Sequence, residues 1–360
     1  MATTEQKNNT VDYLIVGQGI AGSALAISLL NDGKSIAVID NATLSQSSKV
    51  AAGIWNPVVF KRLTKSWLAD ELIPELLEFY SALEKQLNAN FLQLRNILKP
   101  FTEEQEIQLW KKKSVSENTL LDSTIHKELK INEHQIIASY SKVLNAGNLD
   151  MLSFMNAVRE YVKNKSQITY LEETFDFNKL TLTQNEVQYK NQITAKNIVF
   201  CEGHLISQNP YFNWVPMKPA KGETLTISCS NINLNNDILN KGAFIMPLNN
   251  NTFKVGATYE WNDLSDNPTE IGKQELETKL QSIIKTPYTI ISHNAGVRPA
   301  VIDRRPVIGA HPNHSNCLVF NGFGTKAVML VPYFTKHFIG YLNKQHDLNA
   351  EVNVNRFTQK

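Results

Sequence analysis

One glycine pattern near the N-terminus constrains the fold more than any other feature of the chain. Residues 16–22 read VGQGIAG and contain the spacing G-x-G-x-x-G. The apolar run DYLIV leads into them, the alanine- and leucine-rich stretch AGSALAISLLNDG continues from them, and SIAVID comes next. Short apolar runs rich in β-formers predict buried parallel strands, and the stretch between them predicts a helix. The pattern therefore predicts a βαβ unit that opens a Rossmann-like parallel sheet.

In such a unit each glycine has a mechanical role. Gly17 makes the tight turn, Gly19 lets the backbone approach a pyrophosphate, and Gly22 lets the helix pack closely on the strand. The free N–H groups at the helix start bind the pyrophosphate. Asp40 ends the second strand, where it is placed to accept hydrogen bonds from a ribose hydroxyl. An acid there disfavours the 2′-phosphate of NADP, so NAD and FAD remain open. The competing interpretation is a glycine-rich turn that binds no ligand.

Composition and charge exclude several classes of protein. The formal net charge of +2 on 360 residues suggests no general attraction to nucleic acid or to anionic membranes. No run approaches the ~18 apolar residues of a membrane span, and the polar N-terminus MATTEQKNNT is not a secretory signal. The three cysteines lack CxxC spacing and the eight histidines lack metal-binding spacing. We therefore expect a cytoplasmic protein with free thiols and no metal site.

Periodicity predicts how the rest of the chain is organised. Leucines at helical spacing predict a helix at 69–87, and Asn148 is placed to cap another that ends near Val162. A third helix is expected at 273–284, and residues 45–57 are expected to form a loop. Alternating segments within 168–200 and 223–261 predict antiparallel strands.

Two later apolar runs resemble further strands of the nucleotide-binding sheet. They are NIVFCEG at 197–203 and CLVFNG at 317–322, the second followed by a glycine loop and a helix. The chain is thus expected to leave this sheet and return to it twice. The predicted fold class is α/β, a Rossmann-like domain interleaved with an antiparallel-sheet substrate domain. The expected boundaries are 1–60, 143–208 and 293–360 for the first domain, and 61–142 and 209–292 for the second.

Several blocks, taken in order, resemble a known family. They are VGQGIAG with Asp40, SSKVAAGIWNP, IVFCEGH, VGATYEW, and AGVRPAVIDRRPVIG followed by NGFGTKAV. The segment KPAKGETLTI is similar to the family's K-G-Q segment, with Glu223 in place of glutamine. Together these blocks resemble the FAD-dependent D-amino-acid oxidase and glycine oxidase superfamily. The segments AAGIWNP and GFGTK also resemble the oxidase domain of the bifunctional enzyme that modifies wobble uridines in tRNA. Residues 60–143 carry no recognised motif.

The resemblance implies that the cofactor is FAD, held at its ADP end by the first glycine turn and at its flavin end by the C-terminal glycine loop. A helix that starts after this loop would direct its N-terminus at the flavin pyrimidine. The implied cofactor-binding residues are Gly17, Gly19, Ile20, Ala21, Gly22, Asp40, Ser47, Ser48, Ala51, Ala52, Gly53, Phe175, Gly203, Arg298, Gly322, Gly324, Thr325 and Lys326.

Three residues are implied to act on the substrate. Arg298 matches the arginine of the family's G-x-R-P block, whose planar guanidinium pairs with both oxygens of a substrate carboxylate. The alternative role for Arg298 is a structural ion pair with Asp303 or another acid. Tyr259 matches a position that faces the flavin, or else it packs in the sheet. Lys326 would contact the flavin or a second acidic group.

The implied function is oxidation of a C–N bond in an amino acid or N-substituted amino acid. Hydride passes to the flavin, the imine hydrolyses, and oxygen or another acceptor reoxidises the flavin. One alternative is removal of a carboxymethyl group from a modified tRNA wobble uridine, for which Lys61, Arg62 and Lys65 are the sequence's one hint of a basic face. Another is a flavin-binding partner protein without turnover. The expected partner is a small amine or amino acid, neither nucleic acid nor membrane, and oligomeric state is left open.

Overall fold

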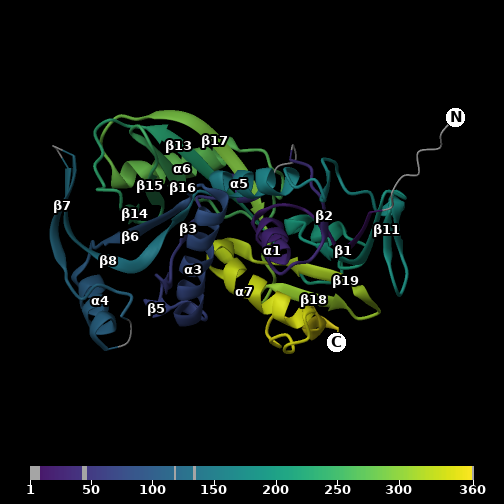
Figure 1. Cartoon of the computed structure of the whole chain (residues 1–360). Helices are drawn as coiled ribbons and strands as arrows, with labels where there is room; N and C mark the ends of the chain where they lie inside the picture. Colours follow the sequence, from purple (N-terminus) through teal and green to yellow (C-terminus); the bar gives the residue numbers. More distant parts are fainter. Residues whose placement is uncertain (1–8, 43–46, 117–118, 133–134, 359–360) are drawn as a thin grey trace.

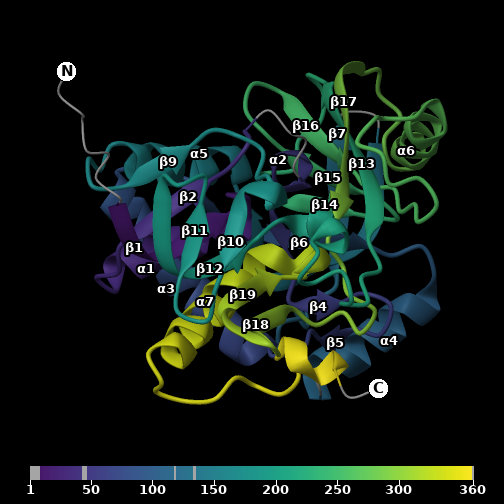
Figure 2. The same ribbon diagram turned by 90° about the vertical axis from the view of Figure 1, so that its right-hand side faces the viewer.

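The structure is a computed structural model that describes residues 9–42, 47–116, 119–132 and 135–358. It consists of two large sheets placed side by side, with helices packed on both (Figures 1 and 2). The first sheet contains the N-terminal strand, and the second contains the three long strands that include or follow the motif-poor region, at 92–100, 126–132 and 135–149. No helix in the described ranges is both long enough and apolar enough to cross a membrane.

The first sheet has a parallel centre, as the glycine pattern predicts. Its central strand lies between two parallel neighbours, so the residues that follow these strands meet at one edge. The strand order is β10 (Leu180–Leu182), β11 (Val187–Tyr189), β12 (Ile193–Phe200), β1 (Asn9–Val16), β2 (Ile36–Ile39), β9 (Thr169–Leu171), with β19 (His314–Asn321) also pairing with β12 and β18 (Val307–His311) pairing with β19.

One strand of this sheet differs from the prediction. Residues 168–200 were expected to form an antiparallel ribbon, and β10, β11 and β12 do pair in that way. However, β9 pairs in parallel with β2 on the opposite side of the sheet. Alternation of apolar and polar residues indicates a strand in the sequence. Whether that strand pairs in parallel or antiparallel depends on where the chain returns to the sheet after a helix.

Four helices form the main core with this sheet. The helix α1 (Ile20–Asn31) is apolar all round and packs on α5 (Met151–Lys163) and α7 (Ala327–Leu342). In turn, α7 packs on α3 (Ala69–Leu87). Asp150 caps α5, accepting a hydrogen bond from Ser153 N at 3.1 Å. The prediction that Asn148 caps this helix is wrong, because Asn148 still belongs to the strand β8 (Gln135–Leu149), where it pairs with Gln93.

The second sheet is antiparallel except for one pair, β14 with β6. The helix α6 (Glu270–Ile283) packs on β13 and β16, and α4 (Glu104–Ser116) lies between β6 and β7 in the chain. The strand order is β17 (Thr289–Arg298), β13 (Ala220–Ser228), β16 (Thr252–Gly256), β15 (Phe244–Pro247), β14 (Ile238–Asn240), β6 (Leu92–Pro100), β8, β3 (Ile54–Trp55), with β7 (His126–Asn132) pairing with β8.

Between the two sheets the chain is less regular. The segment expected to be a loop at 45–57 contains the short helix α2 (Ser47–Val50) and strand β3, while residues 43–46 lie outside the described ranges. The hairpin β4 (Val58–Val59) and β5 (Thr64–Lys65) follows. The predicted domain boundary at 60 therefore falls after β3, which belongs to the second sheet, and the boundary at 293 falls inside β17.

Candidate functional site

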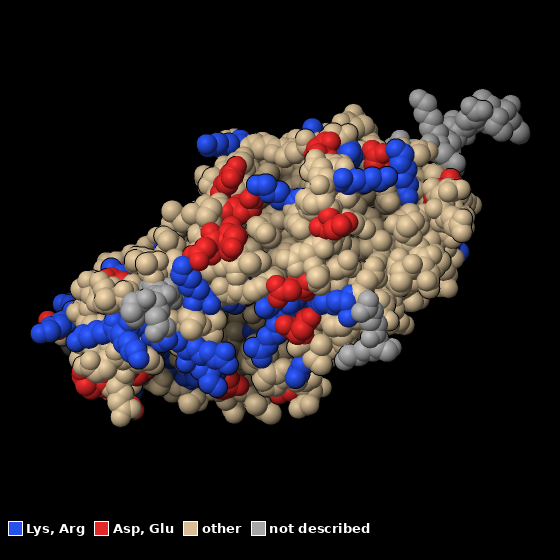
Figure 3. All heavy atoms as spheres, turned by 90° about the horizontal axis from the view of Figure 1, so that it is seen from below, with Lys and Arg blue, Asp and Glu red and all other residues tan. Residues whose placement is uncertain are grey.

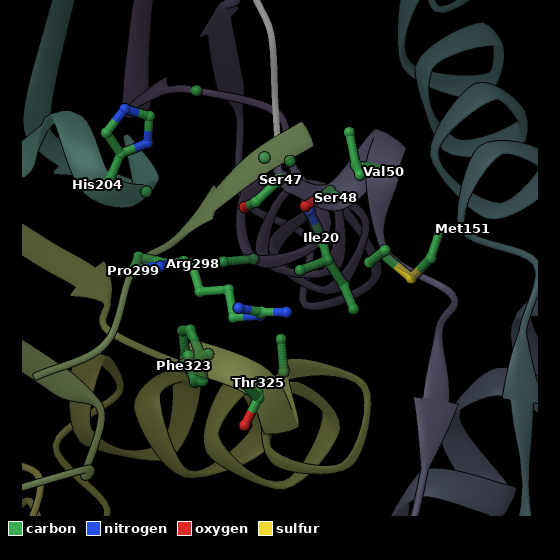
Figure 4. A pocket seen from close by; sticks show the side chains of 18 of the residues that line it. Ile20, Ser47, Ser48, Val50, Met151, His204, Arg298, Pro299, Phe323 and Thr325 are labelled. Atoms are coloured by element: carbon green, nitrogen blue, oxygen red, sulfur yellow. The ribbon is translucent and has the colours of Figure 1, made fainter. Parts of the chain in front are cut away.

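A cavity of about 580 Å³ lies between the two sheets (Figure 4). The first glycine turn lines one part of it and the C-terminal glycine loop lines another, although more than 300 residues separate them in the chain. Most of the cofactor-binding residues expected from the sequence line it, namely Gly17, Gly19, Ile20, Ala21, Asp40, Ser47, Ser48, Ala51, Ala52, Gly53, Phe175, Gly203, Arg298, Gly324 and Thr325. Three do not, which are Gly22, Gly322 and Lys326.

The first turn needs glycine at two positions for steric reasons. Gly17 has φ +91°, and a Cβ on it would lie 2.7 Å from the carbonyl oxygen of Cys201. A Cβ on Gly22 would lie 1.9 Å from the carbonyl oxygen of Gly17. Gly22 therefore acts by letting α1 approach the turn, although it does not reach the cavity itself. The hydroxyl of Ser48 accepts a hydrogen bond from Ile20 N at 3.1 Å, which ties α2 to the start of α1.

Asp40 is buried at the end of β2 and its carboxylate is held from two sides. Oδ1 accepts a hydrogen bond from Gln18 N at 2.8 Å, and Oδ2 accepts one from Nη2 of Arg159 at 2.9 Å. Arg159 also donates to the hydroxyl of Tyr170, which donates to Gln18 Oε1 at 2.7 Å. The sequence predicted Asp40 and missed Arg159, because nothing near Arg159 on α5 indicates that it faces a residue 119 positions earlier.

The segment that follows α2 is shaped by its contact with the second sheet. Gly53 has φ +68°, and a Cβ there would lie 1.9 Å from the carbonyl oxygen of Leu149. Nζ of Lys254, on β16, donates to the carbonyl oxygen of Ala51 at 3.1 Å. The backbone at 51–53 is thus held against the cavity by groups from two other strands.

Glu202 also lines the cavity, and the sequence analysis did not single it out. It lies between Cys201 and Gly203, where β12 ends, and its Oε2 accepts a hydrogen bond from Asn209 Nδ2 at 2.7 Å. Burial raises the pKa of Glu202 to about 7. The hydrogen bond from Asn209 lowers the pKa but offsets only part of this rise. A carboxyl group at this point of the cavity is therefore substantially protonated at neutral pH.

This raised pKa predicts a pH-dependent stability. Burial in the folded protein disfavours the ionised form of Glu202. The protonated carboxyl group therefore contributes its full stability below pH ~4.5, and this stability is lost as the pH rises through about 7. We expect Glu202→Gln to stabilise the protein at pH 8, by at most about 3 kcal/mol, and to have no such effect at pH 4.5. Thermal unfolding at both pH values measures this, with the exposed Glu103→Gln as control. A stabilisation that is equal at both pH values would contradict it.

Arg298 ends β17 and points into the cavity (Figure 4). Its Nη1 donates to the carbonyl oxygen of Lys221 and its Nη2 to that of Thr258, both at 3.1 Å. A Cβ on Gly222 would lie 1.9 Å from Nη2, so the guanidinium lies flat against a backbone that has no side chain there. Burial lowers the pKa of Arg298.

The charge of Arg298 has no acidic partner among the described residues, because no carboxylate there lies within ion-pair distance of its guanidinium. Asp303, the alternative partner suggested by the sequence, accepts hydrogen bonds from Arg356 instead, the shorter at 2.9 Å. A largely buried guanidinium in a cavity, hydrogen-bonded to two backbone carbonyls and to no carboxylate of the described residues, is arranged to receive an anion.

Tyr259 and Lys326 lie outside this cavity. The Tyr259 ring lies against the guanidinium of Arg298, with 4.7 Å between Cζ and the ring centroid, while 46% of the residue is exposed beside Trp261. Lys326 precedes α7, and its Nζ donates to the hydroxyl of Ser66.

The C-terminal loop reaches the same part of the site as Arg298. Gly322 has φ +80° and Gly324 has φ +55°, and Gly324 N donates to the carbonyl oxygen of Pro299 at 3.1 Å. The loop is therefore fixed directly to the residue that follows Arg298.

Glu223 turns away from the cavity, unlike its neighbours Gly222 and Thr224. Its carboxylate accepts hydrogen bonds from Thr269 N and Oγ1, at 3.0 and 2.8 Å, and lies 2.6 Å from Nε2 of His293. It therefore fixes the start of α6.

Several lining residues were not predicted as site residues from the sequence. They come from elements that only the fold brings together, and include Met151, His204, Phe244 and Phe323. No group of three or more His, Cys, Asp or Glu that could hold a metal ion occurs in the part of the chain that the structure describes.

The shape and chemistry of the cavity fit an elongated dinucleotide. Its lining includes the carboxylate of Asp40, the guanidinium of Arg298, and the aromatic residues Phe175 and Phe323. At the start of α1, Gly19 provides no side-chain cap and Ile20 N donates to Ser48, so the next N–H groups and the positive end of the helix dipole are placed to bind a pyrophosphate.

Comparisons with known proteins agree with this geometry. Glycine oxidase of Bacillus subtilis (strain 168) is 28% identical over 137 residues, which cover 38% of this chain and 36% of that protein. The tRNA 5-methylaminomethyl-2-thiouridine biosynthesis bifunctional protein MnmC of Legionella pneumophila (strain Corby) is 22% identical over 187 residues, which cover 43% of this chain and 28% of that protein. Each match thus spans about a third of its curated relative.

Solved structures extend the likeness over nearly the whole chain. Glycine oxidase from Geobacillus kaustophilus superposes with a TM-score of 0.75 at 19% identity, and that from Bacillus cereus ATCC 14579 with 0.76 at 18%. Both alignments cover 94% of this chain and 96% of the other, which establishes the fold. The family model for FAD dependent oxidoreductases, DAO, matches residues 12–338. The chain therefore belongs to the DAO family of FAD-dependent oxidoreductases.

Proposed function

We propose that this protein oxidises a C–N bond of an amino acid or N-substituted amino acid, with Arg298 as the anchor of the substrate carboxylate. The observation that carries the proposal is the largely buried guanidinium in the main cavity, which pairs with no carboxylate of the described residues. Two backbone carbonyls fix one side of it, which leaves the remaining N–H groups for both oxygens of a carboxylate. The similarity to glycine oxidases supports the same substrate class.

The proposed cofactor contacts follow the shape of the cavity. The N-terminus of α1 binds the pyrophosphate of FAD, and Asp40, held by Arg159, accepts from the ribose. Residues 51–53 and the loop at 322–325 take the flavin end. When bound, FAD supplies a two-electron acceptor, which no amino-acid side chain offers.

The protein's own part is orientation and charge placement. Arg298 fixes the carboxylate and so determines which face of the neighbouring carbon is presented for oxidation. Tyr259 packs against the guanidinium and limits its movement. Hydrolysis of the product imine follows in solvent. The CH–NH donor class, rather than an alcohol or a thiol, is the part of the proposal that needs direct testing.

Anaerobic reduction of the bound flavin tests the function. The purified protein is mixed without oxygen with glycine, sarcosine, D-alanine, L- and D-proline and the nucleoside 5-carboxymethylaminomethyluridine, and its absorption near 450 nm is followed. We expect at least one amino acid to bleach the flavin. If dithionite bleaches it and none of these amines does, the proposed C–N oxidation is refuted and a flavoprotein without amine turnover is favoured.

A second candidate is oxidation of a modified tRNA base, which the similarity to MnmC suggests. Lys and Arg side chains do gather around a hollow on one face (Figure 3). Asp and Glu are interspersed on that face, and Lys65 pairs with Asp70 at 2.7 Å, which leaves Lys61 and Arg62 of the expected basic cluster exposed. Binding of tRNA that weakens steeply between 50 and 200 mM salt would support this candidate.

A further inference from the structure

A second, smaller cavity of about 240 Å³ adjoins the first. Ile54, Asn56 and Thr325 line both cavities, so the two lie against each other at the end of the site where Thr325 lies close to Arg298 (Figure 4). Most of the other walls are apolar, made by Trp55, Val58, Val59 and Met329. The remaining lining residue is Lys326.

Lys326 brings a positive charge into this apolar space. Its Nζ donates to the hydroxyl of Ser66, which is itself buried and donates to the carbonyl oxygen of Asn56 at 3.4 Å. In the described ranges no carboxylate lies within ion-pair distance of Nζ. Burial, and next the nearby Arg305, lower the pKa of Lys326 to about 8, so the ammonium is still largely charged at neutral pH.

The surroundings add to this positive potential and do not neutralise it. Arg305 is already engaged, since it stacks on Trp67 at 4.0 Å and pairs with Glu351 at 3.3 Å. Lys326 is also the N-cap of the 16-residue helix α7, and no side chain caps that helix end. An ammonium at the positive end of a helix, in a cavity with apolar walls, is therefore placed to attract an anion.

We propose that the Lys326 cavity is a subsite for a second carboxylate, so that the preferred substrate is an amino or imino dicarboxylate. One carboxylate binds Arg298, the C–N bond lies between the two cavities, and the second carboxylate extends past Thr325 to Lys326. This inference rests on the proposed function. It also explains why Lys326, on the C-terminal glycine loop, lies outside the main cavity: it serves the distal end of the substrate.

Binding of two unreactive analogues tests the subsite. Thiodiacetate and (methylthio)acetate both carry sulfur in place of the amine, and they differ by one carboxylate. We expect thiodiacetate to bind the FAD-loaded protein at least tenfold more tightly, measured by calorimetry or by perturbation of the flavin spectrum. In Lys326→Met that preference should disappear while the affinity for (methylthio)acetate changes less than twofold. The exposed Lys218→Met is the matched control and should keep the preference.

The outcomes separate this inference from the proposed function. Equal affinities for the two analogues in the unaltered protein, or a preference that survives in Lys326→Met, would refute the subsite. The comparison of the two analogues in the unaltered protein needs no variant. If the methionine variant folds poorly, Lys326→Arg provides a second test, because it keeps the charge and should retain the preference for thiodiacetate. Neither analogue has a C–N bond to oxidise, so failure of every amine to bleach the flavin would refute the function without deciding this result.

Discussion

Arg298→Ala should weaken the binding of carboxylate substrates by about two to three orders of magnitude, because a buried carboxylate would lose its counter-charge. The protein should stay yellow, since many other cavity residues are available to hold FAD. Anaerobic titration of the flavin absorbance with the best amino acid from the panel measures the apparent dissociation constant. Arg62→Ala removes an exposed arginine and should leave that constant unchanged.

A companion variant separates the charge of Arg298 from its placement. Gly222→Ala retains the guanidinium but adds a methyl group that would lie only 1.9 Å from its Nη2 atom. The guanidinium must move away from the carbonyls of Lys221 and Thr258, so we expect a weaker affinity for the same substrate, by about tenfold or more. An unchanged affinity in both variants would remove Arg298 from the substrate site.

Gly22→Ala should have the other large effect, on the fold and the cofactor together. The added methyl group would overlap the carbonyl oxygen of Gly17, and because that atom belongs to the backbone of the turn, α1 has to shift away from β1. We expect a loss of about 3 kcal/mol in the free energy of unfolding, the upper end for overpacking, and loss of most bound FAD. Denaturant unfolding and the ratio of absorbance at 450 to 280 nm measure the two effects.

Gly33→Ala is the control for this variant. Gly33 follows the C-terminus of α1, the helix that contains Gly22; it has φ +76°, and a Cβ on it would meet nothing within 4 Å. Gly33→Ala should therefore lower the free energy of unfolding by only about 1 kcal/mol, the cost of a left-handed backbone conformation for alanine, and leave FAD binding intact. If Gly22→Ala were no more harmful than Gly33→Ala, the close approach of helix and turn would not be needed for the site.

Features that depend on neighbouring residues were predictable from the sequence. The strand, glycine turn and helix at 12–31 follow from backbone requirements of consecutive residues, and the parallel centre of the first sheet follows from the βαβ unit. Where a prediction failed, distant partners decided the outcome. Asn148 has the right chemistry for a helix cap, but its pairing with β6 keeps it in a strand and passes the cap to Asp150. Likewise β9 joins β2 rather than the ribbon beside it.

The sequence by itself determined the glycine turn, the class of the fold and the family, because glycine spacing and strand–helix alternation are local and leave a direct mark on the chain. Only the tertiary structure decided which side chains face one another. The register of β13 on β17 brings Gly222 under Arg298, the packing of α5 brings Arg159 to Asp40, and the start of α7 brings Lys326 to Ser66. Such contacts join residues dozens to hundreds of positions apart, and they depend on burial and on the pairing of whole elements, which no short stretch of sequence records.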